Sequence, residues 1–300
     1  MRSFLSGRAA LLIIVLVVIG VGLLVNFVFF KPESAPTPVV VVKPISIPMS
    51  THLIIGKSIE GRNLEAYTYG TGTKELLFVG GIHGGYEWNS VLLAYQFMDY
   101  LEKNPEAIPK NLKITVIPSA NPDGVYSVTG KEGRFTAADV STDQQVLEAG
   151  RFNADKVDLN RNFDCKWQPK STWQSKTVSA GSKAFSEPEA AALRDFILKD
   201  KPVGVIFWHS QANAVYASEC KFGILPETLK MVDIYAEASG YQAIKTFDAY
   251  ETTGDAEGWL ASINIPAITV ELKTHDVIEW EKNLTGSEAL IKYFSQPVVD

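Results

Sequence analysis

Basic residues are in short supply in this 300-residue chain. It has 28 lysines and arginines against 34 aspartates and glutamates, which gives a net charge of −6 with neutral histidines. This acidic balance argues against a nucleic-acid partner and against broad adhesion to anionic membranes. The chain also has no internal repeat. Its 46% apolar and 21% charged residues are typical of a folded protein.

Cysteine is nearly absent as well, because Cys165 and Cys220 are the only two. In an oxidising compartment the two side chains can pair, whereas two separate buried thiols are the alternative. The sequence does not decide between them, since it does not show their separation in space. Neither cysteine lies near the apolar N-terminus, which argues against a lipoprotein anchor there.

The N-terminal part of the chain contains one long apolar run, at residues 9–30. As a helix it would be roughly 33 Å long, enough to cross a bilayer core as a transmembrane anchor. Arg2 and Arg8 precede it, so the positive-inside rule predicts a cytoplasmic tail at 1–8 and an extracytoplasmic body. Residues 31–50, rich in proline and valine, suggest an extended spacer. A cleaved signal peptide is the alternative, although its apolar core is normally shorter.

From residue 51 onward, strand-like and helix-like segments alternate. Strands are predicted at 76–79, 113–117, 203–207 and 268–272, and helices at 88–101, 186–200, 226–239 and 287–294. The second of these helices opens with Ser186 and Glu189, a pair with the spacing of a capping box. The alternation predicts one α/β domain, 51–300, with a central mixed, mostly parallel sheet and helices on both faces. Ligands of such sheets bind at the carboxyl ends of strands.

Two of the four histidines directly follow predicted strands. His83 comes after an apolar run that ends in two glycines and an isoleucine, His209 follows Val-Ile-Phe-Trp, and Glu87 lies four residues after His83. A catalytic zinc ion takes three protein ligands of these types and keeps a fourth position for water. The pattern therefore suggests a zinc site. The alternative is that each histidine is an ordinary core or surface residue.

Glu271 strengthens the zinc interpretation. It lies within the apolar strand 268–272, where a carboxylate is costly to bury unless it is paired or faces a polar site. Metal-assisted hydrolysis needs a general base that takes a proton from water, and Glu271 is the candidate. An inward glutamate paired with a lysine or an arginine is the alternative.

Polar stretches of the chain hold Arg151 and the pair Asn160 and Arg161. A guanidinium offers a planar fork of donors that suits a carboxylate or a polarised carbonyl oxygen. Most arginines form ion pairs at the protein surface, so these residues by themselves are weak evidence for a substrate-binding site.

Together these segments resemble the zinc carboxypeptidases of the carboxypeptidase A superfamily. The resemblance covers nearly the whole predicted domain, and its seven segments occur in family order. They are Gly80-Gly81-Ile82-His83-Gly84, Asn121-Pro122-Asp123-Gly124, Arg151 with Asn153-Ala154, Asp158-Leu159-Asn160-Arg161-Asn162-Phe163, His209-Ser210, Tyr250 and Thr269-Val270-Glu271-Leu272. Each segment alone is moderate evidence, and all seven in the same order are strong evidence.

The resemblance implies hydrolysis of the C-terminal peptide bond of a substrate. It implies one zinc ion per chain, held by His83, Glu87 and His209, with Glu271 as the general base and acid. One departure concerns the spacing, because three residues separate His83 from Glu87 where the family usually has two. Two of the three are glycines, which allow a bulge that still presents Glu87 to the metal.

The resemblance also implies how the substrate is held. Arg151 would polarise the scissile carbonyl and stabilise the oxyanion. Asn160 and Arg161 would bind the terminal carboxylate, and Tyr250 would close over the substrate. Asp123 looks structural, and it corresponds to a family residue that supports a ligand histidine from behind.

Two acids follow the Tyr250 position, where members of the family line the pocket for the C-terminal side chain. Asp255 and Glu257 at the floor of this pocket would favour a basic end group, such as lysine, arginine or the amino group of diaminopimelate. A solvated loop is the alternative.

The expected substrates are peptides, including cell-wall muropeptides, with a free C-terminal carboxylate, and the predicted membrane contact is the N-terminal helix. One rival function is that of an aspartoacylase-like deacylase, which acts on small N-acyl amino acids. The Asn-Pro-Asp-Gly and Asp-Leu-Asn-Arg-Asn-Phe segments, with Tyr250, favour the peptidase. A second rival is a tethered binding protein that has lost catalysis, and the presence of Glu271 argues against it.

Overall fold

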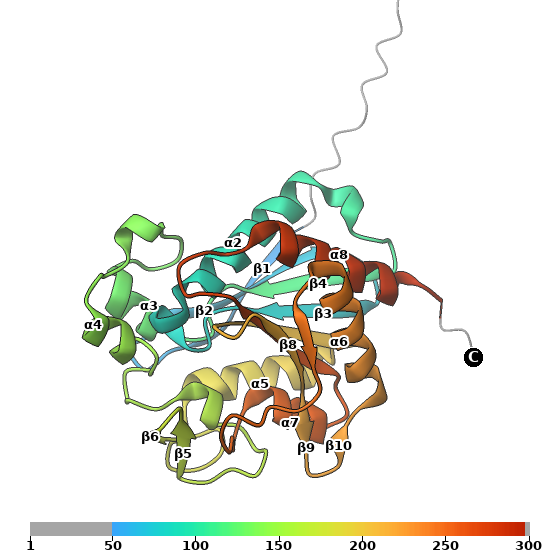
Figure 1. Ribbon diagram of the computed structural model, residues 1–300. Coiled ribbons are helices and arrows are strands. Elements are labelled where there is room, and N and C mark those ends of the chain that lie inside the picture. Colours follow the sequence, from blue (N-terminus) through green and yellow to red (C-terminus); the bar gives the residue numbers. More distant parts are fainter. Residues whose placement is uncertain (1–49, 298–300) are drawn as a thin grey trace, which may run out of the picture. The chain divides into compact units, whose positions relative to one another are not determined.

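The computed structural model describes residues 50–297 of the chain. The predicted cytoplasmic tail, transmembrane anchor and nearly all of the predicted spacer, at 1–49, lie outside the described residues. Within the part that the structure describes, no helix is both long and apolar enough to cross a membrane. These residues form an α/β fold around one eight-stranded sheet (Figure 1).

The sheet is mixed, and its strands follow the order β1-β2-β4-β3-β7-β12-β8-β11. The strands are β1 (Ser50–Lys57), β2 (Asn63–Gly70), β3 (Lys74–Val79), β4 (Leu112–Ile117), β7 (Gly204–Ser210), β8 (Ala214–Ala217), β11 (Gln242–Ile244) and β12 (Ala267–Leu272). β3 is parallel to β4 and β7, β7 is parallel to β12, and β8 is parallel to β11. The pairs β1–β2, β2–β4 and β8–β12 are antiparallel. The sheet is therefore mostly parallel, as predicted.

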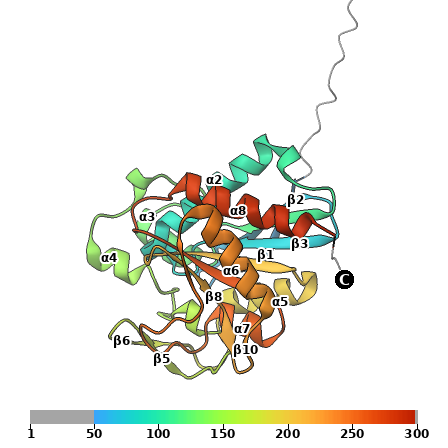
Figure 2. The ribbon, with the colours of Figure 1, turned by 45° about the vertical axis from the view of Figure 1, so that its right-hand side comes forward.

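Helices cover both faces of the sheet (Figures 1 and 2). The main helices are α2 (Trp88–Lys103), α5 (Pro188–Asp200), α6 (Pro226–Ser239), α7 (Ala256–Ser262) and α8 (Trp280–Ser295). The shorter ones are α3 (Pro122–Thr129), α4 (Gln144–Ala149) and the 3₁₀ turns η1 (Gly84–Glu87), η2 (Pro105–Ala107), η3 (Ala137–Asp139) and η4 (Leu159–Arg161). Two hairpins lie outside the sheet, β5 (Lys170–Trp173) with β6 (Lys176–Ser179), and β9 (Glu219–Cys220) with β10 (Gly223–Ile224).

Alternate side chains of the central strands enter two separate cores. Phe78 of β3 and Trp208 of β7 pack with α2, α6 and α8, and their ring centroids are 5.1 Å apart. Leu77 and Phe207, their neighbours in sequence, pack with α5 and α7 on the opposite face. Because both faces are covered, these strands are buried throughout, which accounts for their continuous apolar sequences.

The four predicted strands are confirmed, and two predicted helix starts are wrong. α5 begins at Pro188 without the capping box, because the carboxylate of Glu189 instead accepts a hydrogen bond from the Ile59 amide at 3.1 Å. α8 begins at Trp280, seven residues before the predicted start, and contains Gly286. A Cβ on Gly286 would lie 2.6 Å from the Tyr235 ring, so this glycine serves close packing of α8 on α6 and does not mark a helix end.

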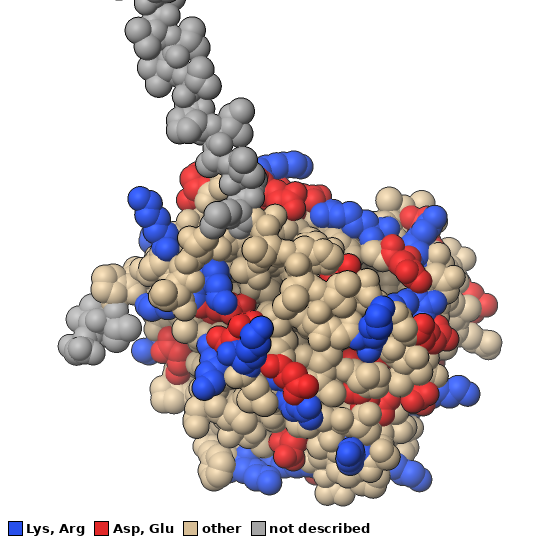
Figure 3. All heavy atoms as spheres, turned by 180° about the vertical axis from the view of Figure 1, so that it is seen from behind, with Lys and Arg blue, Asp and Glu red and all other residues tan. Residues whose placement is uncertain are grey.

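The surface opposite to the view of Figure 1 carries mixed charge. On the face that Figure 3 shows, lysines and arginines are interspersed with aspartates and glutamates, and uncharged areas lie between them. This face therefore has no extended area of positive charge.

Candidate active site

The predicted site residues lie at the carboxyl ends of neighbouring parallel strands. β3 leads to His83, and His209 lies near the end of the adjacent β7. Glu271 of β12 is paired in register with His209. Adjacent parallel strands end at the same edge of a sheet, so this order brings the three residues together from distant parts of the chain.

His83, Glu87 and His209 form a metal-binding cluster. Each offers one ligand atom, and the three atoms lie within 4.8 Å of one another. All three side chains are buried, and the Nδ1 atom of His83 has no hydrogen-bond partner among the described residues. Two imidazoles and one carboxylate are a donor set that suits zinc. The cluster therefore fits one metal ion.

A short 3₁₀ turn absorbs the extra residue between His83 and Glu87. η1 carries Gly84 at a φ of 48° and ends at Glu87, directly before α2. A Cβ on Gly84 would lie 2.4 Å from the carbonyl oxygen of Gly150, so only glycine fits at this position. The turn places the Glu87 carboxylate beside both histidines despite the longer spacing.

Asp158 is the acid that lies beside His83, without a hydrogen bond to its ring. Its Oδ1 lies 3.4 Å from His83 Nδ1, and its side chain is fully buried. Asp123, which was predicted to be structural, does not contact His83 in the described contacts. Asp123 accepts hydrogen bonds from Ser58 Oγ at 2.6 Å and from Arg62 at 2.8 Å. Burial and the nearby guanidinium of Arg151 lower the pKa of His83 to about 4, which keeps the ring neutral, as a metal ligand must be.

His209 lies between two carboxylates. Its Nδ1 is 3.0 Å from Glu87 Oε2, and its Nε2 is 3.0 Å from Glu257 Oε1. Burial alone would lower the pKa of His209, but the two carboxylates raise it well above its ordinary value. An acceptor at Nε2 holds the proton on that nitrogen and leaves Nδ1 for a metal ion beside Glu87.

Glu257 lines the cavity and also has a second set of contacts that the sequence did not suggest. It was predicted as an acid at the floor of the substrate pocket. Although it borders the cavity, its side chain is almost fully buried and is hydrogen-bonded to His209 and to the Thr269 hydroxyl. The physical reason is that α7 packs against β12 and turns this residue of its first turn towards β7.

Glu271 projects into the same site. Its Oε2 is buried and has no hydrogen-bond partner among the described residues. Burial and the carboxylate of Glu87 raise the pKa of Glu271 above its ordinary value, and His209 opposes them. The alternative of a simple salt bridge is not what the structure shows, because no lysine or arginine is paired with Glu271 in the described part of the chain.

Arg151 is buried beside the metal-binding cluster. Its Nε donates to Asp158 Oδ2 at 2.9 Å, its Nη2 lies 3.1 Å from His83 Nε2, and its Nη1 lies 3.7 Å from Glu87 Oε1. The guanidinium also lies over the ring of Trp173, at 4.5 Å from the centroid. This arrangement holds a positive charge next to the cluster, at a position from which a substrate carbonyl can be polarised.

A cavity of about 530 Å³ opens over these residues, and its wall includes Asn160, Arg161, Tyr250 and Asp255. Asn160 Oδ1 accepts a hydrogen bond from the amide of Ala256 at 2.8 Å, which ties η4 to the start of α7. Arg161 donates from Nε and Nη2 to the carbonyl of residue 172, and from Nη1 to the carbonyl of Asn160. The guanidinium is thus held rigidly in the wall.

Tyr250 and Asp255 lie on the segment that leads into α7. Tyr250 packs against Phe247, with ring centroids 4.9 Å apart. Asp255 caps α7 by accepting from the amide of Gly258 at 2.6 Å, and it remains partly exposed. Burial and the carboxylate of Glu257 raise the pKa of Asp255 to about 6. The segment is therefore not a freely solvated loop at Asp255.

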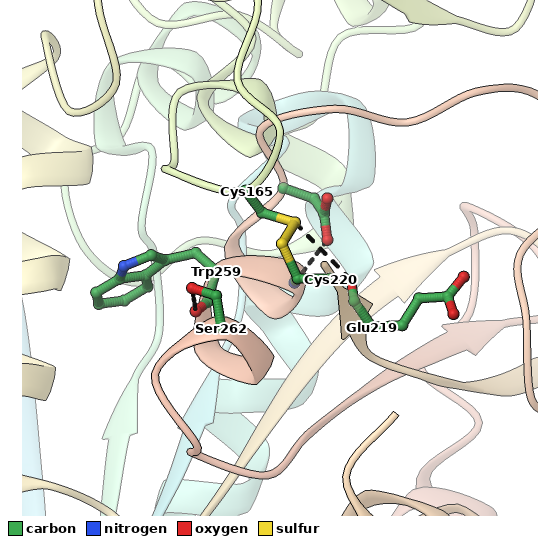
Figure 4. Close-up of a disulfide and its surroundings, with 7 residues drawn as sticks. Cys165, Glu219, Cys220, Trp259 and Ser262 are labelled. Atoms are coloured by element: carbon green, nitrogen blue, oxygen red, sulfur yellow. Dashed lines mark hydrogen bonds between the residues drawn. A yellow bond between two sulfur atoms is a disulfide. The ribbon is translucent and has the colours of Figure 1, made fainter. Parts of the chain in front are cut away.

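A disulfide joins the two cysteines, which settles the alternative that the sequence left open. Cys165 and Cys220 are bonded, with a Cα–Cα distance of 6.0 Å (Figure 4). The bond ties the segment that follows Arg161 to β9, and Trp259 and Ser262 of α7 lie close by. It therefore connects two parts of the cavity wall that are 55 residues apart.

Three further residues of the cavity wall were not identified from the sequence. Tyr86, Trp173 and His275 contact one another in a row, with centroids 5.1 Å apart for Tyr86 and Trp173 and 4.6 Å apart for Tyr86 and His275. The one signal in the sequence was that His275 is among only four histidines and lies four residues after Glu271.

Comparison with known proteins gives a consistent family match. The model of the zinc carboxypeptidase family matches residues 45–279. A gamma-D-glutamyl-L-diamino acid endopeptidase 1 of Lysinibacillus sphaericus is 25% identical over 240 residues, which cover 73% of this chain and 59% of that protein. A zinc carboxypeptidase of Simulium vittatum is 27% identical over 244 residues, which cover 74% of this chain and 78% of the relative.

Among solved structures, a murein-tripeptide amidase from Escherichia coli O157 is similar with a TM-score of 0.55 and 22% identity. The match covers 83% of this chain and 93% of the amidase. At this identity the likeness concerns the fold alone.

Proposed function

The chain belongs to the zinc carboxypeptidase family, and on this premise we propose that it is a metallocarboxypeptidase that hydrolyses the C-terminal amide bond of peptides. The donor set of His83, Glu87 and His209 suits one zinc ion, and Glu271 lies beside it with an unpaired carboxylate oxygen. Metal-assisted hydrolysis needs a metal site with a general base close to it.

The observation that carries the carboxypeptidase assignment is the state of Arg161. Three of its five N–H groups are committed to the backbone carbonyls of residues 160 and 172. One N–H on each terminal nitrogen therefore has no protein partner in the described structure, and Arg161 lines the cavity. Two parallel donors of this kind bind a carboxylate in a bidentate manner. Arg161 and the metal-binding cluster line the same cavity, so a carboxylate bound at Arg161 would direct the last amide bond of the substrate into that cavity.

The residues of the chain divide the remaining work. A bound zinc ion supplies Lewis acidity and lowers the pKa of the attacking water. Glu271 takes the proton from this water at its unpaired oxygen and passes it to the leaving amine nitrogen. Arg151 stabilises negative charge that develops on the scissile carbonyl oxygen. Tyr250 closes the cavity over the substrate.

A basic end group is the proposed preference of the substrate pocket, and it rests on Asp255. Asp255 is partly exposed in the cavity wall, whereas Glu257 is engaged with His209. One relative is named as a gamma-D-glutamyl-L-diamino acid endopeptidase. A diamino acid carries a second amino group, and the carboxylate of Asp255 can bind such a group through a charge-assisted hydrogen bond. Muropeptides that end in a diamino acid are therefore proposed substrates.

The deacylase alternative is less well supported. A cavity of about 530 Å³ lies within the range of sites for drug-sized ligands, and a small N-acyl amino acid does not need this volume. The inactive binding protein is also less well supported, because Glu271 is present beside the cluster.

We also propose that the catalytic domain lies outside the cytoplasm, anchored by residues 9–30. Arg2 and Arg8 before this segment support the orientation. The disulfide between Cys165 and Cys220 supports an oxidising compartment. Protease added to intact cells should remove the domain, and full protection would contradict the proposed orientation.

The test of the function is mass spectrometry of a peptide library that includes purified muropeptides, after incubation with the purified full chain and zinc. We expect loss of one C-terminal residue, preferentially a basic one. The control is Glu271→Gln, which should be inactive while still binding zinc. Internal cleavage, or release of an acyl group without loss of a terminal residue, would refute the carboxypeptidase assignment.

A further inference from the structure

His275 lies in the cavity wall, on the loop between β12 and α8, and the proposed chemistry gives it no role. It is not one of the residues of the metal-binding cluster. Its ring is held on one side by Tyr86 and at one nitrogen by Ser210. The side chain is partly exposed, and its hydrogen-bond partners determine what its free nitrogen offers to the cavity.

A chain of hydrogen bonds fixes the tautomer of His275. The amide nitrogen of Asn89 donates to the carbonyls of Thr274 at 2.6 Å and Val277 at 3.0 Å, so both of its hydrogens are used. Asn89 Oδ1 can only accept, and it accepts from Ser210 Oγ at 3.0 Å.

The single hydrogen of the Ser210 hydroxyl is therefore committed to Asn89. Its oxygen can only accept from the ring of His275, whose Nδ1 lies 2.6 Å away. Nδ1 of His275 must carry the proton. Burial lowers the pKa of His275, so the ring is neutral at pH 7 and its Nε2 is an unprotonated acceptor.

Nε2 of His275 has no protein partner in the described structure, and the residue borders the cavity. Its contacts place the ring beside the metal-binding cluster, because Ser210 directly follows His209 in the chain and Tyr86 directly precedes Glu87. On the other side, the rings of Tyr86 and Trp173 stand between His275 and the segment that holds Arg161.

His275, Arg161 and the metal-binding cluster line the same cavity. A substrate with its terminal carboxylate at Arg161 and its scissile carbonyl at the cluster extends its acyl side away from Arg161. An N–H group on that side would pass the part of the cavity wall next to the cluster, which includes His275 and Tyr86.

We propose that His275 is a specificity-determining residue that accepts a hydrogen bond from an N–H group on the acyl side of the scissile bond. The inference rests on the proposed peptidase function. It predicts that the protein selects acyl-amino substrates over substrates that present an oxygen at the same position, because an oxygen cannot donate and its lone pairs face those of Nε2.

The test uses two matched substrates that release the same C-terminal lysine. One has an acyl–NH–CH2–CO– group before the scissile amide, and the other has oxygen in place of that N–H. We expect the full chain with zinc to favour the N–H substrate in kcat/KM by roughly tenfold, the size expected for one hydrogen bond. His275→Leu should bring the ratio close to one, and His275→Gln, which restores an acceptor, should recover part of it. Zinc content and melting temperature are measured for each variant.

The matched control is His52→Leu, because His52 lies on β1, stacked on Tyr67, and is remote from the cavity residues. This variant should keep the wild-type ratio. An unchanged ratio in His275→Leu would overturn the inference, as would an equal loss of activity on both substrates, which indicates a structural role. Hydrolysis of neither substrate by the wild type would overturn the proposed function and the inference with it.

A second measurement does not depend on activity. In the nitrogen-15 NMR spectrum of a histidine-labelled sample at pH 7, His275 should show a protonated Nδ1 and an unprotonated Nε2. Assignment is direct, since the chain has four histidines and His275→Gln removes one set of signals. A protonated Nε2 would remove the acceptor and overturn the inference.

Discussion

Replacing Asp158 by asparagine should weaken both the metal site and the fold. The fully buried carboxylate of Asp158 receives a hydrogen bond from Arg151 Nε at 2.9 Å and lies 3.4 Å from His83 Nδ1. Burial alone would raise the pKa of Asp158, but Arg151, Arg161 and His83 hold it well below its usual range. Asparagine keeps the shape and removes the charge.

The expected cost can be estimated from these contacts. Breaking a buried ion pair by removing one charge typically costs about 3–5 kcal/mol, because the partner stays buried and unpaired. In the variant, Arg151 still has a second carboxylate nearby, that of Glu87 at 3.7 Å. We therefore expect a loss of stability at the lower end of this range, about 3 kcal/mol. For a domain of this size that corresponds to a fall in melting temperature of roughly 6–12 °C. Loss of the acid behind a ligand histidine should lower zinc affinity roughly 10- to 100-fold.

The pH dependence has a defined sign. A carboxyl group whose folded pKa is depressed stabilises the protein above its unfolded pKa of about 3.9, and this contribution disappears as the pH falls through the folded value. The difference in stability between the wild type and Asp158→Asn should therefore be largest at neutral pH. It should shrink as the pH is lowered below about 4.

The assay is calorimetry of the metal-free proteins together with zinc affinity from competition with a chelator. Asp123→Asn is the matched control, because Asp123 is also buried and paired with an arginine but does not contact His83. It should lose stability and keep its zinc affinity within about twofold, since only residues that orient a ligand tune the metal. Equal zinc affinities of Asp158→Asn and the wild type would refute the reasoning, and so would a larger affinity loss in Asp123→Asn.

Three other measurements address the metal site, the disulfide and the pocket. Glu87→Ala should abolish stoichiometric zinc binding in equilibrium dialysis, and full zinc retention would show that Glu87 is not a ligand. Replacing Cys165 and Cys220 by serine should lower the free energy of unfolding in urea by about 4 kcal/mol, because the bond closes a loop of 55 residues; an unchanged midpoint would contradict this estimate. Because burial and a neighbouring acid raise the pKa of Asp255 to about 6, the kcat/KM ratio for lysine-ended over leucine-ended peptides should rise with pH through that value. Asp255→Asn should flatten the ratio, and a pH-independent ratio in the wild type would remove Asp255 from the pocket.

Local pattern was enough to predict the architecture and the position of the metal ligands. The central strands are buried on both faces, so their apolar runs were visible in the sequence without any knowledge of their neighbours. His83 and His209 stand at the ends of such runs, in a chain with only four histidines, which made them strong candidates for a metal site. The family resemblance then implied that Glu87 is the third ligand of the same metal ion and that Glu271 is the general base.

Partnerships between distant residues were beyond the sequence. Asp123 and Asp158 both lie in motifs of the right kind, and only the 3.4 Å distance between Asp158 and His83 in the folded chain shows that Asp158 is the one beside this histidine. The sequence suggested Glu257 as a pocket acid, and only the packing of α7 on β12 shows that its carboxylate also contacts His209. The pairing of the two cysteines likewise depended on a Cα–Cα distance of 6.0 Å between segments 55 residues apart.

The sequence by itself thus determined which residue types stand at which strand ends, because hydrophobic periodicity and strand length are local properties. The tertiary structure alone decided which carboxylate orients each histidine, which acid remains in the cavity, and that His275 offers an acceptor to it. These depend on the order β3-β7-β12 in the sheet and on how the helices pack over it. Contacts of this kind join residues that are close in space and far apart in the chain, and no local pattern records them.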